Sequence, residues 1–245
     1  MMLPVQASFS RSPAHSRIVK IKPVYLIWNK KTINDFSPES INTLYNDGYV
    51  FTRTGKGDMI QTRSLRIDLS QFDISSENRR ILRKTDQLLT NIHSSLPTDN
   101  YHWSIGKMAH DFYETKFGKG TFSANKAKEL FTDKTKSNFN SLFEYRNENQ
   151  TIGYAICYEN SLILHYAYPF YELGTVNSEL KNIGMSMMLQ AILSAKERGL
   201  KYIYLGSAQR PTDTYKLQFS GIEWFQEKNW SKNTEELKET LAQQT

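Results

Sequence analysis

The segment from Leu162 to Gly206 constrains the fold more than any other part of the chain. It begins with the alternating stretch LILHYAY, which predicts a strand with Tyr166 and Tyr168 on the same face. An amphipathic helix follows and ends at Gly199, before a short apolar strand at 202–205. A strand, a helix and a second strand in this order form a crossover connection, which predicts an α/β fold with a parallel strand pair.

The start of this helix has the character of an anion-binding loop. Amide groups at a helix N-terminus carry partial positive charge and can bind a phosphate or a carboxylate. Lys181, Gly184 and Ser186 resemble the pyrophosphate loop Gln/Arg-x-x-Gly-x-Gly/Ala of the acetyltransferase superfamily known as GNAT. The match is degenerate, and a plain helix start that contains one glycine is an equal alternative.

Composition narrows the class of protein. The chain has 245 residues, 13% of them aromatic and 23% charged, which is typical of a globular protein with a substantial core. One cysteine, Cys157, excludes an internal disulfide and a thiolate metal cluster. We see no apolar run of membrane-spanning length and no signal peptide near Met1, so we expect a cytoplasmic protein without a membrane partner.

The segment 76–93 is predicted to be one helix, capped by Ser76, with a basic face. Arg79, Arg80, Arg83 and Lys84 fall within an arc of about 140° that contains no acid, opposite an apolar face. The first 100 residues also hold 14 Lys and Arg against 9 Asp and Glu, so most of the net charge of +6 lies there. Such a row can bind phosphates in a salt-dependent way, and a solvated surface is the alternative.

The remaining pattern completes a GNAT-like order of elements. Helices are expected at 104–117 and 124–132, and strands at 139–145, 153–158 and 162–168, ahead of the crossover helix. We therefore predict an α/β fold: a GNAT-like mixed central sheet with flanking helices, preceded by a smaller α+β region. The predicted division is a basic N-terminal region at 1–97, the acyltransferase domain at 98–230 and a polar tail at 231–245.

Other chemistry is less well supported. Cys157 and His165 lie on neighbouring predicted strands, but their positions in mid-strand favour a core thiol and a hydrogen-bonded histidine over a nucleophile pair. His102 and His110 do not have the spacing of metal ligands on one helix, so no metal site is expected. The chain is rich in tyrosine between 154 and 215, and a buried tyrosine needs a hydroxyl partner, so some should line a polar cavity.

Two longer runs, together with the stretch YAYPFYELGT between them, resemble one family. The run LRIDLSQFDISSENRRILRKT (residues 65–85) and the run YIYLGSAQRPTDTYKLQFSGIEWFQEKNW (residues 202–230) resemble the arginyl-tRNA–protein transferases and their bacterial leucyltransferase relatives. The resemblance covers about residues 48–230. It implies a GNAT superfold whose activated donor is aminoacyl-tRNA in place of acetyl-CoA, with no cofactor. The acceptor would be the α-amine of a protein whose first residue is acidic or otherwise a degradation signal.

The resemblance also implies roles for individual residues. Aminolysis of the aminoacyl ester would take place near the Leu205–Gly206 strand end, where backbone amides polarise the carbonyl. The implied catalytic residues are Tyr168, Tyr215 and Lys216. The implied substrate-binding residues are Tyr166, Tyr171, Gly174, Leu205, Gly206 and Glu223. The implied tRNA-binding residues are Arg79, Arg80, Arg83 and Lys84.

Two departures from the family pattern leave the substrates open. The cysteine cluster usual before the Leu-Arg-Ile strand is absent, since residues 59–63 read Met-Ile-Gln-Thr-Arg. The usual Tyr-Asp-Pro is replaced by Ala167, Tyr168 and Pro169. An acetyl-CoA-dependent acetyltransferase and a non-catalytic tRNA-binding homologue therefore remain as alternatives.

Overall fold

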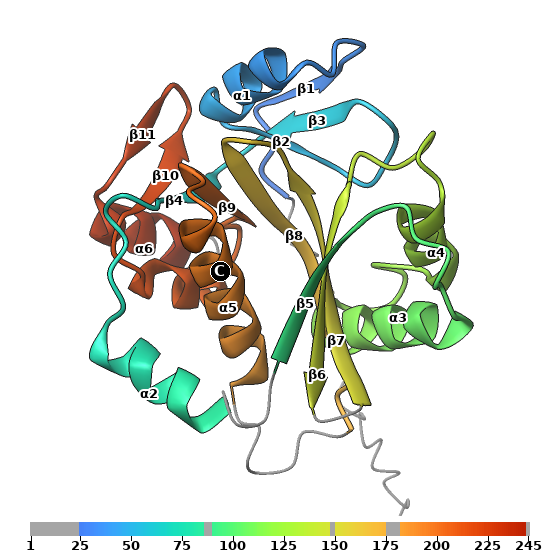
Figure 1. Ribbon diagram of the computed structural model, residues 1–245. Coiled ribbons are helices and arrows are strands. Elements are labelled where there is room, and N and C mark those ends of the chain that lie inside the picture. Colours follow the sequence, from blue (N-terminus) through green and yellow to red (C-terminus); the bar gives the residue numbers. More distant parts are fainter. Residues whose placement is uncertain (1–24, 86–89, 148–149, 175–181, 244–245) are drawn as a thin grey trace, which may run out of the picture.

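A computed structural model describes residues 25–85, 90–147, 150–174 and 182–243 (Figure 1). A large mixed sheet has the strand order β11-β10-β4-β9-β8-β7-β6-β5, and its one parallel pair is β8 with β9. Its strands are β4 (Ser64–Asp68), β5 (Thr90–Ser95), β6 (Ser141–Asn147), β7 (Gln150–Glu159), β8 (Ile163–Tyr171), β9 (Tyr202–Ser207), β10 (Ile222–Gln226) and β11 (Asn229–Ser231). A smaller antiparallel sheet has the order β1-β3-β2 and contains β1 (Asn29–Thr32), β2 (Tyr49–Phe51) and β3 (Asp58–Gln61).

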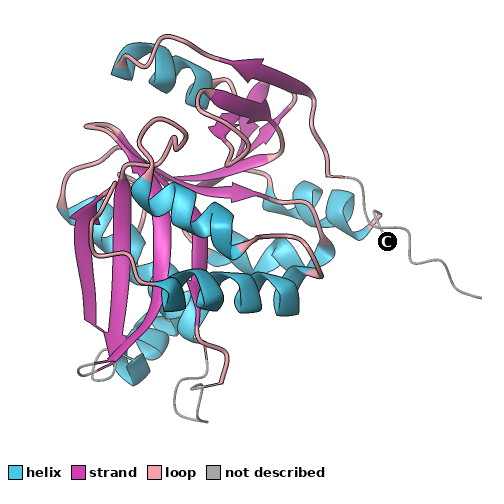
Figure 2. Ribbon diagram, turned by 90° about the vertical axis from the view of Figure 1, so that its right-hand side faces the viewer, coloured by secondary structure: helices cyan, strands magenta, loops and turns pink. Residues whose placement is uncertain are grey.

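Helices cover both faces of the large sheet (Figures 1 and 2). One face carries α2 (Ser76–Thr85), α5 (Ile183–Glu197) and α6 (Thr234–Ala242), which pack with the sheet in one apolar core. The other face carries α3 (Trp103–Phe117) and α4 (Ala124–Thr132), together with α1 (Pro38–Asn46) and the small sheet. The predicted fold class, a mixed sheet with flanking helices, is confirmed, and its meander and crossover follow the GNAT order.

The crossover forms because α5 buries nearly a whole helical surface against the sheet. Met187, Leu189, Ala191 and Ile192 are fully buried, so the helix is more enclosed than an ordinary surface helix. Its C-terminal end is followed by Gly199 in a left-handed conformation (φ 74°), where the chain turns into β9. The strand–helix–strand prediction for this segment is confirmed.

One predicted helix is much shorter than expected. Helix α2 ends at Thr85, and residues 90–95 form the edge strand β5, which pairs antiparallel with β6. The prediction of a helix over 76–93 is therefore wrong in its second half. The cap was also displaced by one residue, because Ser75 Oγ accepts a hydrogen bond from the Asn78 amide. Ile92 fits a helical apolar face as well as a strand, but it lies 42% exposed on β5.

The two sheets do not divide at residue 97. The small sheet lies within residues 29–61, whereas β4 and β5, also before residue 97, belong to the large sheet. The C-terminal residues include α6, whose Leu237 and Leu241 are fully buried. The division at 97 and 231 stays a prediction, and the large sheet joins residues from both sides of each position.

A bulge in β8 changes the direction of one predicted site residue. In the pairing with β7, Tyr166 lies opposite Cys157 and Tyr168 lies opposite Ile156, so Ala167 is the extra residue. Tyr166 consequently packs in the core under α5, and Tyr168 packs with the aromatic residues on the α3 face. The expectation that both tyrosines share one face of the strand is wrong, because simple alternation does not allow for a bulge.

Candidate active site

The parallel strands β8 and β9 diverge within the large sheet. Pairing between β8 and β9 ends at His165 and Tyr204, although both strands continue. Gly206 then adopts a left-handed conformation (φ 75°), and a Cβ placed on it would meet no described atom within 4 Å. We refer to the diverging ends, residues 166–171 and 205–207, with the side chains around them, as the candidate site. Each strand stays paired on its other edge, to β7 and to β4, so only the backbone groups on the two facing edges can donate to and accept from a substrate there.

Lys216 reaches this site from the 3₁₀ helix η2 (Pro211–Gln218). Its Nζ donates to the Ser207 carbonyl at 3.1 Å, and burial lowers the pKa of the Lys216 ammonium. The positive charge of Lys216 also contributes to lowering the pKa of His165, next to the last strand pair. The sequence placed Lys216 at the acyl-transfer site, and its position beside β9 agrees with that role, which remains a prediction.

Tyr25 contacts the site from the N-terminal side. Its hydroxyl hydrogen-bonds the Ser207 hydroxyl, and desolvation of the Tyr25 hydroxyl raises its pKa although much of the side chain is exposed. The adjoining Leu26 amide donates to Gln209 Oε1 at 2.8 Å, and Gln209 Nε2 donates to Thr62 Oγ1 at 2.8 Å. These bonds hold the segment before β1 across the end of β9. Sequence reasoning missed Tyr25 and Ser207, since neither lies in a quoted motif.

Tyr168 forms an aromatic wall on the α3 side of the site. Its ring stands edge-on to Phe139 and lies near Phe122, with ring-centre separations of 5.2 and 5.8 Å. The Arg53 guanidinium lies 5.2 Å from the centre of the Tyr168 ring. Burial raises the pKa of Tyr168, and the charge of Arg53 and hydrogen bonds to Arg53 act in the opposite direction. Tyr168 is therefore a neutral hydroxyl that can share a proton with a bound substrate.

Tyr215 lies at the outer edge of the site. Its side chain is 46% exposed, and desolvation of its hydroxyl, aided by Asp213, raises the pKa of Tyr215 to about 12. The Arg210 guanidinium pairs with Asp213 at 3.2 Å and lies over the Phe117 ring at the end of α3. The connection after β9 thus contacts the end of α3 around Tyr215.

The other predicted substrate-binding residues occupy different depths. Tyr166 is buried beside the Tyr145 hydroxyl, Leu205 is buried, Tyr171 is half-buried and Gly174 is exposed after β8. Gly184 lies under the Tyr171 ring, since a Cβ there would approach Tyr171 Cε1 to 3.2 Å. These residues surround the site, and their contact with substrate stays a prediction.

Glu223 forms a buried ion pair. Its Oε2 accepts from Arg66 Nε at 2.8 Å, and the two side chains are 11% and 6% exposed. The Arg66 guanidinium also lies between the Tyr202 and Trp230 rings, at 4.1 and 3.8 Å from their centres. Glu223 therefore links β10 to β4, the strand that pairs with β9. From this position it would fix the strands that support the site, as the sequence predicts.

The start of α5 holds the residues that resemble a pyrophosphate loop. Ser186 is fully buried, and its hydroxyl bonds Thr85 Oγ1 at 2.6 Å, which ties α5 to the end of α2. Asn182 precedes the helix in a left-handed conformation (φ 77°). Lys181 lies outside the described residues. The placement of Ser186 favours the plain helix start over the phosphate loop.

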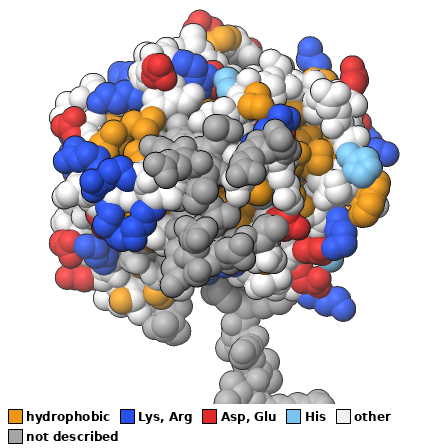
Figure 3. Space-filling view, turned by 60° about the horizontal axis from the view of Figure 1, so that its bottom comes forward, with side chains coloured by type: hydrophobic (Ala, Val, Ile, Leu, Met, Phe, Trp, Pro, Cys, Tyr) orange, Lys and Arg blue, Asp and Glu red, His pale blue; other side chains and the backbone are white. Residues whose placement is uncertain are grey.

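The basic row on α2 faces outward. Arg79, Arg80, Arg83 and Lys84 are all exposed, and Figure 3 shows Lys and Arg side chains gathered on the side where α2 lies in Figure 1. Arg80 differs from the others because its Nε and Nη2 both bond the Glu77 carboxylate, at 2.7 and 2.5 Å. Glu77 lies just outside the predicted arc of cations, but its side chain reaches Arg80 and neutralises one of the four charges. The end of α2 contacts the first turn of α5, and the same turn of α5 lies against Tyr171. The basic row therefore lies on a helix next to an element of the candidate site.

Cys157 and His165 do not form a catalytic pair. Cys157 packs in the core under α5, where burial raises the pKa of its thiol. His165 is directed toward α1, and its Nδ1 bonds the Tyr45 hydroxyl at 2.9 Å. The Tyr45 hydroxyl also accepts from the Phe51 amide, so His165 takes part in a buried hydrogen-bond network on the α1 side.

Acid should destabilise the fold through His165. Burial, followed by the charge of Lys216, lowers the pKa of His165 from 6.5 to about 3, so the unfolded chain binds this proton first. The contribution of neutral His165 to the free energy of unfolding is fully present above about pH 6.5 and is lost as the pH decreases. At pH 5 this loss lowers the free energy of unfolding by about 2 kcal/mol. Urea unfolding of wild type and H165Q at pH 7.5 and pH 5 checks this. The H165Q loss should be smaller by that amount, and an equal loss in both proteins would contradict the assignment.

Comparisons with known proteins were made against families, curated proteins and solved structures. A scan against protein-family models finds no match. The aspartate/glutamate leucyltransferase of Saccharophagus degradans is 24% identical over 170 residues, covering 68% of this chain and 69% of that protein. The aspartate/glutamate leucyltransferase of Ruegeria pomeroyi is 26% identical over 204 residues, covering 79% of this chain and 72% of that protein. The resemblance drawn from the sequence motifs is confirmed, and the chain is an enzyme of the acyltransferase class.

Solved structures with some likeness to the chain are more distant. L-PGS from Bacillus licheniformis is 14% identical with a TM-score of 0.44, and the match covers 70% of this chain and 52% of that one. FemX is 9% identical with a TM-score of 0.43, covering 71% and 60%. A GCN5-related N-acetyltransferase from Kribbella flavida is 10% identical with a TM-score of 0.34, covering 70% and 55%. The chain thus spans little more than half the length of these structures. Within the described residues, no helix has the length and apolar character needed to cross a membrane.

Proposed function

We propose that this enzyme transfers an aminoacyl group from a charged tRNA to the N-terminal α-amine of an acceptor protein. The observation that carries the proposal is the divergence of β8 and β9, where Lys216, Tyr168 and Ser207 lie around strand edges that no longer pair with each other. The basic row on α2 lies beside the same core element, α5, and supplies the cations that a polyanionic donor requires.

The proposed reaction is direct aminolysis of the aminoacyl ester. The neutral α-amine attacks the ester carbonyl, the developing oxyanion is stabilised by backbone amides near Gly206 and by the Lys216 cation, and the ribose oxygen leaves with a proton. In this proposal Tyr168 relays that proton, because burial raises its pKa and keeps its hydroxyl protonated. No cofactor is needed, since the ester itself is activated.

Leucine is the first donor to test, and Asp and Glu are the first acceptor residues, because both curated relatives carry the name aspartate/glutamate leucyltransferase. Purified enzyme is incubated with labelled leucyl-tRNA or arginyl-tRNA and peptides that begin with Asp, Glu or Ala, and products are weighed by mass spectrometry. Addition of an aminoacyl group to the α-amine supports the proposal. Stabilisation by acetyl-CoA alone would indicate an acetyltransferase, and tRNA binding without transfer would indicate a non-catalytic homologue.

The α2 row predicts a graded loss of tRNA binding. Arg79, Arg83 and Lys84 have no carboxylate partner among the described residues, whereas Arg80 is held by Glu77. The triple substitution R79E/R83E/K84E should reduce the slope of log affinity against log salt by about 2 to 3, with the fold retained. Filter binding over a salt series measures this slope. R80Q is the matched control and should change it least; an unchanged slope in the triple variant would exclude α2 from the tRNA surface.

A further inference from the structure

Arg53, like Lys216, is a cation at the candidate site for which the described residues show no carboxylate ion pair. Its Nη2 donates to the Thr121 carbonyl at 2.6 Å, and this neutral partner leaves the positive charge uncompensated. Two neighbouring arginines already form ion pairs within the chain: Arg66 pairs with Glu223, and Arg210 pairs with Asp213. A half-buried guanidinium without an anion is suited to bind a carboxylate from outside the chain.

The Arg53 guanidinium is fixed in orientation by two aromatic rings. It lies 5.0 Å from the centre of the Phe122 ring and 5.2 Å from the centre of the Tyr168 ring. Phe122 is itself stacked on Tyr113 at 4.7 Å, so α3 and the following connection support the arrangement. Aromatic rings packed against an arginine restrict the orientation of its planar guanidinium.

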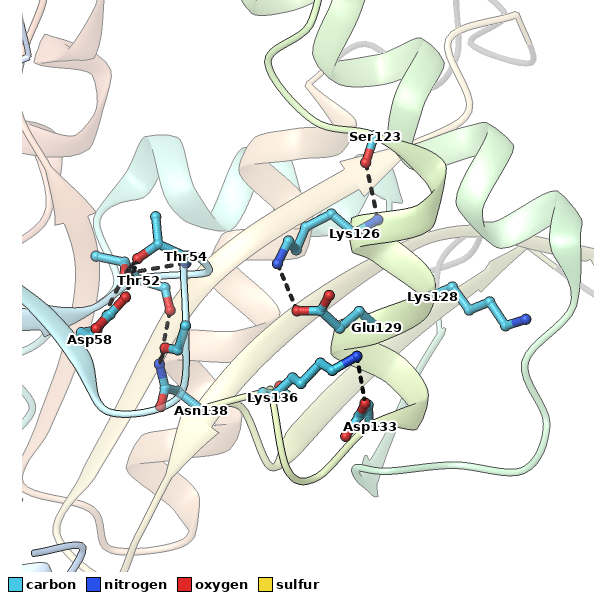
Figure 4. Close-up of polar contacts among 12 residues, drawn as sticks. Thr52, Thr54, Asp58, Ser123, Lys126, Lys128, Glu129, Asp133, Lys136 and Asn138 are labelled. Carbon is cyan, nitrogen blue, oxygen red and sulfur yellow. Dashed lines mark hydrogen bonds and ion pairs between the residues drawn. The ribbon is translucent and has the colours of Figure 1, made fainter. Parts of the chain in front are cut away.

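The loop that carries Arg53 is also held rigidly (Figure 4). Asn138 Nδ2 donates to the carbonyls of Thr52 and Gly55 at 3.0 and 2.8 Å, and Asn138 Oδ1 accepts from the Gly57 amide at 2.7 Å. Asp58 accepts from the Thr54 hydroxyl at 2.8 Å within the same turn. A preorganised arginine spends less conformational entropy on binding, so its contact contributes more to affinity.

Arg53 lies beside the residue that we place at the reacting centre. Tyr168 contacts the guanidinium with its ring and lies on β8 beyond the last pair that β8 forms with β9. In an N-terminal Asp or Glu, the side-chain carboxylate and the α-amine belong to the same residue. A carboxylate bound at Arg53 therefore brings the attacking amine next to Tyr168, and a residue without the carboxylate would not be held there.

We propose that Arg53 binds the side-chain carboxylate of the acceptor's first residue and so determines the preference for acidic N-termini. This inference rests on the proposed aminoacyl transfer and adds to it the residue that selects the acceptor. Loss of a charge-assisted bond should reduce transfer to Asp and Glu peptides, and should leave transfer to the uncharged Asn and Gln peptides nearly unchanged.

The test compares R53Q and R53K with wild type on two peptides that differ only in Asp or Asn at the first position. R53Q should lower kcat/KM for the Asp peptide about 10- to 100-fold and change the Asn peptide little, so that the ratio approaches one. R53K should retain an intermediate preference, because it keeps the charge without the planar fork. K128Q is the matched control, because it removes one positive charge, as R53Q does. Lys128 is exposed on the adjacent α4 and points away from Asn138 in Figure 4.

The outcomes separate the inference from the proposed function. If wild type transfers an aminoacyl group with equal rates to Asp and Asn peptides, or if R53Q lowers both rates equally, Arg53 does not read the carboxylate, although transfer itself stands. If wild type transfers to no peptide, the proposed function fails. Thermal unfolding of each variant shows whether a reduced transfer rate results from a destabilised fold. If R53Q is destabilised, the ratio of the R53K rates on the Asp and Asn peptides tests the inference instead.

Discussion

Replacing Arg66 with Met should lower the free energy of unfolding by about 3 to 5 kcal/mol, the largest stability effect expected of a single substitution here. The Arg66–Glu223 pair is almost completely buried, so R66M leaves the Glu223 carboxylate without its partner in a medium that solvates it poorly. The Arg66 guanidinium also donates to Asn46 Oδ1 and the Tyr204 hydroxyl, at 3.2 and 3.4 Å, and both bonds would be lost.

Urea unfolding of four proteins checks this expectation. The double variant R66M/E223L should recover most of the loss, because removing both charges ends the cost of burying one alone. R146M is the surface control: Arg146 pairs with Glu144 at 2.7 Å but is 42% exposed, so its loss should be below about 1 kcal/mol. A destabilisation by R66M no larger than that of R146M would show that Lys232, at 3.9 Å from Glu223, is a sufficient replacement partner.

The regular parts of the fold followed from the sequence because local pattern and tertiary environment agree there. The crossover from β8 through α5 to β9 was predicted from strand alternation, a helical apolar stripe and Gly199. The folded structure has the elements that each of these local patterns predicts. The stretch 76–95 did not, because its apolar residues satisfy a helix and an edge strand equally well. Which pattern forms is decided by β6, a partner about 50 residues further along the chain.

The candidate site was predictable only where motifs name it. Tyr215 and Lys216 lie in a run that resembles the family, and the structure places Lys216 at the end of β9. Arg53 and Tyr25 carried no signal, since a single cation in a turn or a tyrosine before a strand is common on protein surfaces. Their positions depend on Asn138 and Ser207, which are distant in sequence. The bulge at Ala167 likewise results from pairing with β7, so the direction of Tyr168 could not be read from alternation.

Replacing Lys216 with Met should lower kcat for aminoacyl transfer about 10²- to 10³-fold with little change in KM. The Lys216 ammonium lies at the end of β9, and its charge would stabilise the ester oxyanion, which exists only in the transition state. K201M, which removes an exposed cation just before the other end of β9, should have a normal kcat.

The pH profile distinguishes this role from a structural one. The attacking α-amine must be neutral, so the rate should rise with pH through the amine pKa of about 7.7 to 8.0. Lys216 must be protonated to stabilise the oxyanion, and burial lowers its pKa below the usual 10.5, so the rate should fall again at alkaline pH. The alkaline decline should disappear in K216M, because no ammonium remains to lose its proton. A decline that persists in K216M would assign it to another group, and a wild-type rate that keeps rising would instead make the neutral Lys216 amine a base.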